Sequence, residues 1–63
     1  MCESNVYIND SEGGEVLLLE KVDKIIPKDD ELFMENIFGE RKILKARIKE
    51  MALVDHRIVI EKL

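Results

Sequence analysis

Residues 51–60, which read MALVDHRIVI, decide the fold of this chain. Two apolar runs, Met51–Val54 and Ile58–Ile60, flank the polar pair Asp55-His56. Asp is one of the residues that tolerate tight-turn geometry, so the stretch predicts a β-hairpin with its turn at residues 55 and 56. A hairpin needs a strand on each side of its turn, and we therefore predict that both apolar runs are strands.

The preceding segment, Glu40–Val54, fits two structures when it is taken alone. Its residues are good helix formers, and Leu44, Ile48 and Met51 recur at helical spacing. As a strand it alternates equally well, with Leu44, Ala46 and Ile48 facing inward and basic residues facing outward. Those basic residues are Lys45, Arg47 and Lys49. The local pattern does not separate helix from strand, but the hairpin that follows favours the strand.

Short strand-like segments also occupy the rest of the chain, each bounded by residues typical of turns. The predicted strands are Ser4–Ile8, Glu15–Leu19, Val22–Ile26 and Leu32–Met34. The predicted turns are Asp10–Gly14, Lys28–Asp30 and Asn36–Gly39. Pro27 has no N–H to offer to a sheet, so we expect the third strand to stop there.

Six short strands at close spacing predict an all-β fold, a small antiparallel barrel. No internal repeat or linker divides the chain, so residues 1–63 are expected to form a single domain. With three aromatic residues and no Trp, the core must be aliphatic, and Met34 and Met51 are expected to help fill it. Domains of this size often gain stability from a disulfide, a metal or a partner subunit, and one cysteine cannot form an internal disulfide.

The composition argues against two classes of protein. The net charge of −4 is opposite to the basic excess of most nucleic-acid-binding proteins. No apolar stretch approaches the roughly 20 residues that span a bilayer, and the N-terminus lacks the pattern of a signal peptide. We therefore expect a cytoplasmic protein, in which Cys2 stays a thiol.

Cys2 is the candidate metal ligand. Removal of Met1 would give it a free amine beside its thiol, and these two groups close a five-membered chelate ring; if Met1 stays, its amine and the Cys2 amide could serve with the thiolate. Thiolate and nitrogen donors in one plane suit Ni(II) or Cu(II). Two chains related by a twofold axis would supply two sulfurs and two nitrogens. A cysteine near a terminus is common, however, so this pattern alone does not distinguish a ligand from an incidental thiol.

Several runs of the sequence resemble a known family. The opening, Met1-Cys2-Glu3-Ser4-Asn5-Val6-Tyr7, is similar to the start of the CooT family, small proteins linked to maturation of nickel carbon monoxide dehydrogenase. The run Ile37–Glu40 resembles the central turn of that family, and Arg47–Glu50 and His56–Val59 resemble its final hairpin. The chain departs from the family pattern at Ala46, where we expect Gly, and at Met51-Ala52, where Ile-Asp is more usual.

The resemblance implies an SH3-like or Sm-like barrel and a homodimer that holds one Ni(II) ion through Cys2 of each subunit. It implies an accessory protein, serving nickel insertion into carbon monoxide dehydrogenase, and not an enzyme. A flexible terminal thiol also makes a poor catalytic nucleophile, and His56 is the only histidine that could assist it. We expect His56 to have a structural role in its turn, because a role as ligand would require the fold to bring it close to Cys2.

The alternative is a metal-free Sm-like interaction module that binds RNA through Lys45, Arg47 and Lys49. No aromatic residues interleave with these charges to stack on bases, so a solvated basic face is the simpler interpretation. The acidic run Asp29-Asp30-Glu31 likewise lacks the spaced oxygen ligands of a calcium loop and is expected to form a solvated turn.

Overall fold

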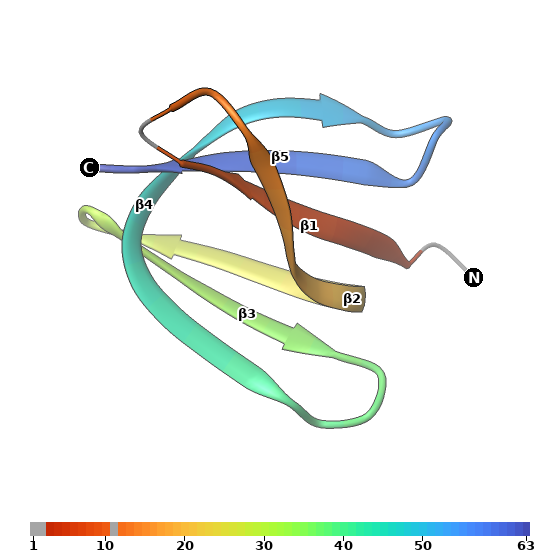
Figure 1. Cartoon of the computed structure of the whole chain (residues 1–63). Helices are drawn as coiled ribbons and strands as arrows, with labels where there is room; N and C mark the ends of the chain where they lie inside the picture. The colour runs from red at the N-terminus through yellow and green to blue at the C-terminus, as the bar shows by residue number, and fades with distance from the viewer. Residues whose placement is uncertain (1–2, 11) are drawn as a thin grey trace.

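The structure is a computed structural model that describes residues 3–10 and 12–63. Within these residues the chain forms five strands: β1 (Ser4–Asn9), β2 (Glu15–Lys28), β3 (Glu31–Asn36), β4 (Arg41–Ala52) and β5 (Arg57–Lys62). Successive strands pair antiparallel, and β5 pairs parallel to β1, which closes a barrel (Figure 1). The prediction of a small all-β barrel is confirmed. The described part of the chain includes no helix that could span a membrane.

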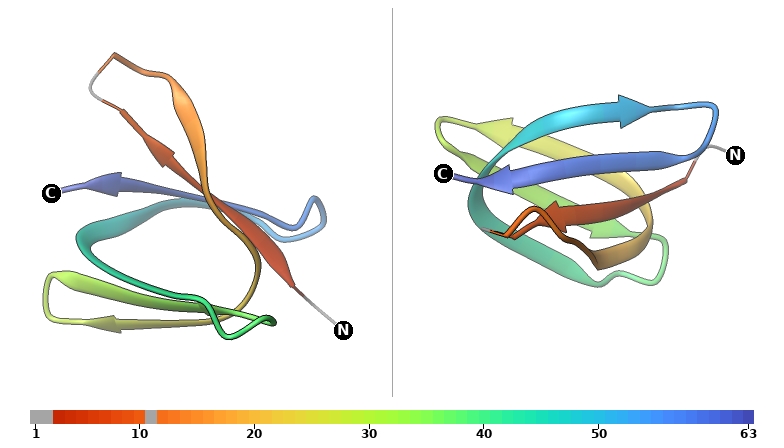
Figure 2. Two further views of the ribbon diagram at one scale, coloured as in Figure 1. Left: turned by 60° about the horizontal axis from the view of Figure 1, so that its bottom comes forward. Right: turned by 45° about the horizontal axis from the view of Figure 1, so that its top comes forward.

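The described residues form five strands where the sequence suggested about six, because residues 15–28 form one bent strand. β2 pairs with β1 through Glu15–Val22 and with β3 through Val22–Lys28. The bend lies at Lys21, whose φ of 54° is left-handed, and the register with both neighbours shifts around it. Such bulges sharpen the local twist of a strand. One strand can therefore serve both halves of the barrel, as the curve of β2 in Figure 2 shows.

The prediction that a strand stops at Pro27 was wrong, because β2 continues to Lys28. A two-residue turn, Asp29-Asp30, joins β2 to β3, and Lys28 pairs with Glu31 across it. In such hairpins the pair next to the turn is hydrogen-bonded and the following pair is not. Pro27 pairs with Leu32 at that following position, so its missing N–H removes no hydrogen bond between β2 and β3.

Most of the ambiguous segment Glu40–Val54 is a strand, as the hairpin argument indicated, but the strand ends at Ala52, so the prediction that it continues through Leu53 and Val54 was wrong. β4 pairs with β3 through residues 41–45 and with β5 through residues 46–52. Ala46 is buried in the core, and Leu44 and Ile48 pack against it. Ala46 and Met51-Ala52, where the sequence departs from the family pattern, are all paired with residues of β5. The turn spans Leu53–His56, and His56 adopts a left-handed φ of 54°.

The barrel interior is aliphatic, as the composition indicates. Its buried cluster consists of Val6, Leu19, Val22, Leu32, Met34, Ala46, Ile58 and Ile60. Met34 is fully buried and fills the centre of this cluster, as expected. The expectation that Met51 joins it was wrong, because Met51 remains 55% exposed.

The outer face of the β2–β3–β4 sheet carries three cross-strand rows. The strand registers align Lys24–Glu35–Arg41, Ile26–Phe33–Ile43 and Lys28–Glu31–Lys45. Glu35 joins both neighbours in its row: Arg41 Nε lies 3.1 Å from one carboxylate oxygen and Lys24 Nζ lies 3.4 Å from the other. The hydrogen bonds from Arg41 and then Lys24 hold the pKa of Glu35 below its ordinary value of 4.5.

Replacement of Met34 by Ala should lower the free energy of unfolding by about 2–5 kcal/mol, because it removes buried methylenes and leaves a cavity in a small core. Chemical denaturation measures this loss. The matched control is Val54→Ala, at a site 93% exposed, which should change the unfolding free energy by less than about 0.5 kcal/mol. Equal effects of the two substitutions would contradict the core assignment.

The lowered pKa of Glu35 predicts a pH-dependent contribution to stability. The ionised carboxylate is favoured in the folded state, so its contribution is present above the unfolded pKa and disappears as pH falls through the folded pKa. Glu35→Gln should therefore be less stable than the wild type at pH 7, and the difference should shrink as the pH is lowered below 4.5. Denaturation of both proteins across this range tests the direction, and a difference independent of pH would contradict it.

Candidate metal centre

The sequence-predicted ligand, Cys2, lies outside the residues that the structure describes, and the first described residue is its neighbour Glu3. Within residues 3–10 and 12–63, no group of three His, Cys, Asp or Glu side chains is placed to hold a metal ion. The described residues therefore offer no alternative centre of that kind. A metal at this terminus would depend on the donors of Cys2 itself.

The start of β1 lies at one end of the barrel, together with two turns. Figures 1 and 2 show the β3–β4 turn and the β4–β5 turn at this end, while the C-terminus lies at the opposite end. The corner of β2 at Lys21 belongs to the same end, because Ser4 pairs with Val22. We call this the N-terminal end of the barrel.

Asn5 ties the N-terminal strand to this end of the barrel. Its side-chain Oδ1 accepts a hydrogen bond from the Lys21 N–H at 3.1 Å, and its own backbone N–H donates to the His56 carbonyl at 2.9 Å. The Lys21 carbonyl in turn accepts from the Ile37 N–H at 2.9 Å. The left-handed corner of β2 thus has both of its backbone polar groups bonded, one to β1 and one to the β3–β4 turn. Sequence reasoning missed this role, although Asn5 lies within the Ser4–Tyr7 run of the family resemblance.

Glu3 adds a surface ion pair to the same corner. Its carboxylate lies 3.6 Å from Lys21 Nζ, and both side chains are partly exposed. Exposed pairs of this kind contribute about 0–1 kcal/mol, so the pair orients the chain more than it stabilises it. The hydrogen bonds of Asn5 therefore hold the start of β1, and the Glu3 pair adds a weak side-chain contact from the residue that follows Cys2.

The β3–β4 turn is organised by Asn36, a buried polar residue that is 2% exposed. Its Oδ1 accepts from the N–H groups of Glu40 at 2.8 Å and Phe38 at 3.1 Å, and its Nδ2 donates to the Glu40 carboxylate at 2.7 Å. Gly39 supplies the left-handed φ of 85° that the turn requires. The Ile37–Glu40 motif is therefore structural: it shapes the turn whose Ile37 N–H holds the β2 corner.

His56 contributes to the N-terminal end of the barrel through its backbone carbonyl. Among the described residues it belongs to no group of three potential metal ligands. Its carbonyl accepts from Asn5, and its side chain is exposed. The expected structural role in the turn agrees with this placement. A ligand role beside Cys2 stays untested, because Cys2 is outside the described residues.

An apolar groove opens beside the N-terminal strand. Its volume is about 310 Å³, and it lies between the second half of β2 and the second half of β4. Ser4, Pro27, Met51 and Leu53 are among the residues that line it. Met51 and Leu53 are exposed, so apolar side chains lie at the surface close to the N-terminus.

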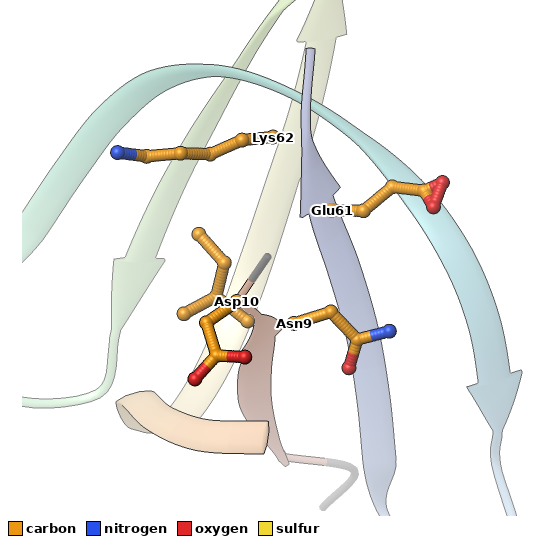
Figure 3. Close-up of a pocket in the computed structure, with 5 residues that line it drawn as sticks. Asn9, Asp10, Glu61 and Lys62 are labelled. Atoms are coloured by element: carbon orange, nitrogen blue, oxygen red, sulfur yellow. The ribbon is translucent and has the colours of Figure 1, made fainter. Parts of the chain in front are cut away.

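A larger pocket, of about 600 Å³, lies at the other end of β1 and β5. Its labelled side chains, Asn9, Asp10, Glu61 and Lys62, point in different directions (Figure 3). Asp10 accepts from the backbone N–H groups of its own turn, and Glu61 pairs with Arg47. Two of its three charged groups are therefore committed to internal contacts, and the pocket offers no convergent site for a ligand.

The basic residues of β4 are exposed, as their alternation predicted. Arg47 forms an ion pair with Glu61 at 3.1 Å, which agrees with a basic face balanced by acids. The register with β5 shifts between Ile48 and Glu50, so Lys49 stands outside the regular pairing. The alternative of RNA binding through Lys45, Arg47 and Lys49 stays a prediction.

Asn5→Ala should speed hydrogen exchange at the Lys21 amide and lower the unfolding free energy by about 0.5–1.5 kcal/mol, because it removes one hydrogen-bond acceptor. Amide exchange measured by NMR reports on this position directly. Asn5→Asp is the matched control, since it keeps the accepting oxygen and should retain most of the protection. If Lys21 exchanges at the wild-type rate in Asn5→Ala, Asn5 does not hold the corner.

Comparisons with known proteins point to one family. The family model described as CO dehydrogenase accessory protein CooT matches residues 1–61. A crystal structure assigned to CooT from Carboxydothermus hydrogenoformans is similar to this chain with a TM-score of 0.89 and 50% sequence identity, over 98% of each chain. A search of curated proteins finds no match.

Proposed function

This chain belongs to the CooT family of CO dehydrogenase accessory proteins, and from that membership we propose that it binds Ni(II) through Cys2 and supplies nickel to CO dehydrogenase. The proposal includes a cytoplasmic location and no catalytic activity of its own. The metal is cargo for the client enzyme, so the chain needs to bind it reversibly and to present it.

The observation that carries the proposal is the anchoring of the N-terminal strand up to Glu3. One peptide unit joins Cys2 to Glu3, so their Cα atoms are about 3.8 Å apart whatever the conformation of the terminus. Asn5 and the Glu3–Lys21 pair attach this strand to a closed barrel. This attachment supports a site at the N-terminal end of the barrel, because position 2 is one peptide unit from the attached segment.

The chemistry of the terminus suits a nickel carrier. A thiolate and an amine, or a thiolate and amide nitrogens, give the soft, planar donor set that Ni(II) favours. Binding displaces protons from these donors, so affinity decreases as the pH falls. Proton competition or donors on the client would then assist release.

We propose that two subunits share one ion at a twofold axis. Sharing requires the two N-termini to meet, so the surfaces around Ser4 must face each other. The apolar groove beside Ser4, with exposed Met51 and Leu53 at its rim, supports a contact at this place. An ion that binds only the folded dimer also stabilises a domain with so small a core.

Nickel titration of the wild type and Cys2→Ala tests the proposal. The wild type should bind one ion per two chains in calorimetry and develop thiolate-to-metal absorbance, and Cys2→Ala should lose both signals. His56→Ala is the control, because it removes the other soft donor and should bind as the wild type does.

Non-denaturing mass spectrometry of the same samples reports the number of subunits, the bound metal and the presence of Met1. Equal nickel binding by the wild type and Cys2→Ala would refute the proposal. Binding of one ion to a single chain would refute the shared site while leaving Cys2 as a ligand.

A further inference from the structure

The outer face of the β2–β3–β4 sheet has an apolar row across its centre. Ile26, Phe33 and Ile43 lie side by side through the strand registers. Ile26 is 48% exposed and Ile43 is 63% exposed, while Phe33 lies partly buried between them. Paired residues on neighbouring strands lie about 4.5–5.5 Å apart, so the three side chains form one continuous strip.

Charged rows flank this strip on both sides. Four cations occupy the corners of the array, and two carboxylates occupy its middle column. The cations are Lys24, Lys28, Arg41 and Lys45, and the carboxylates are Glu31 and Glu35. The face thus carries a formal charge of +2, whereas the whole chain carries −4. These nine residues thus carry more cations than carboxylates, and the exposed Asp29 and Asp30 adjoin them in the β2–β3 turn.

The two charged rows differ in how fully they are neutralised. In the row nearer the N-terminal end, Glu35 binds both Lys24 and Arg41. In the other row, the structure shows no ion pair within 4.0 Å between Glu31 and either Lys28 or Lys45, all of which it describes. Of the four cations on this face, Lys28 and Lys45 are therefore the two that are most able to bind carboxylates of another molecule.

The pattern fits a protein better than a nucleic acid. A phosphate backbone would need a continuous cationic path, and here the apolar row and the two carboxylates interrupt it. Phe33 is the one aromatic residue in the three rows, so the face lacks the series of aromatic side chains on which successive bases stack. An apolar side chain flanked by carboxylates matches both the strip and its charged borders.

The position of the face also favours a partner over a second copy of the chain. It lies on the flank of the barrel, so dimerisation through the groove beside Ser4 would involve Lys24 at its edge and leave the apolar strip and the Lys28–Glu31–Lys45 row free on each subunit. Its first row begins at Lys24, two residues along β2 from Val22, the partner of Ser4, and its last row contains Lys28, six residues from Val22. The face therefore extends from about 7 Å to about 20 Å along the strand from the start of β1, a span that one docked protein can cover.

We propose that this face docks the client enzyme, through a segment of CO dehydrogenase that carries an apolar side chain between acidic residues. The proposal rests on the proposed function for the identity of the client. The apolar side chain packs on the Ile26–Phe33–Ile43 strip, and its flanking carboxylates pair with Lys28 and Lys45. The face thereby orients the client with respect to the nickel donor.

The test measures binding of the full chain to purified, immobilised CO dehydrogenase by biolayer interferometry. Ile43→Ser and the double variant Lys28→Glu/Lys45→Glu should each weaken binding by about tenfold or more, the loss typical of a central contact. Val16→Ser is the control for the apolar change, at an exposed site on the other half of β2. Lys49→Glu/Lys62→Glu is the control for charge, since it changes the net charge equally, and both controls should bind within about twofold of the wild type.

Three outcomes would overturn the proposal. If the enzyme binds the wild type and the face variants equally well, the client docks elsewhere, and nickel binding at Cys2 is unaffected. If the wild type binds nickel but does not bind the enzyme, both the docking face and the assigned client are wrong. If Ile43→Ser converts a dimer to a monomer in sedimentation without enzyme, the strip is a contact between copies. If the wild type instead binds the enzyme through this face but binds no nickel, the proposed nickel function is wrong and the docking face stands.

Discussion

The structure depends on one left-handed residue, Lys21, at which β2 turns from one half of the barrel to the other. A bend of this kind removes backbone groups from regular pairing, and each unpaired group that is shielded from water costs free energy. Here the Lys21 N–H and carbonyl bond to Asn5 and Ile37, from β1 and the β3–β4 turn. The same hydrogen bonds therefore support the corner and hold the N-terminal strand.

The sequence could predict the class of fold because its turn chemistry is strong and local. The structure has turns or bends at residues 12–13, 29–30 and 37–39, within or beside the predicted ones, and Gly13, Asp29 and Gly39 supply their left-handed backbone. The hairpin at residues 53–56 resolved the ambiguity of β4. Two features were beyond local reasoning. The local pattern predicts a gap between two strands at Glu20-Lys21 and the end of a strand at Pro27. Both positions lie within β2, because residues 15–22 pair with β1 and residues 22–28 pair with β3, and local sequence does not show this change of neighbour.

For the candidate site, the sequence supports a prediction about chemistry alone. The donor properties of Cys2 follow from its residue type and position, whereas the contacts that hold the neighbouring strand could not be predicted. Asn5 and Asn36 are polar residues with several possible roles, and their partners lie 16 residues away in one case and in a neighbouring turn in the other. The apolar strip on the outer face could not be predicted either, because Ile26, Phe33 and Ile43 belong to three separate strands. Cross-strand register, and not composition, assembles both the corner and the face.

The parallel pairing of β1 with β5 joins the beginning of the chain to its end. The first strand gains its second neighbour, and Asn5 gains the His56 carbonyl, only when residues 57–62 have joined the sheet. During synthesis the N-terminus leaves the ribosome first but is the last part to be fixed, because such distant contacts must await the full chain. Completion of translation thus separates an early, free first strand from the paired one, and a truncated product would never hold Ser4–Asn9 between its two neighbours.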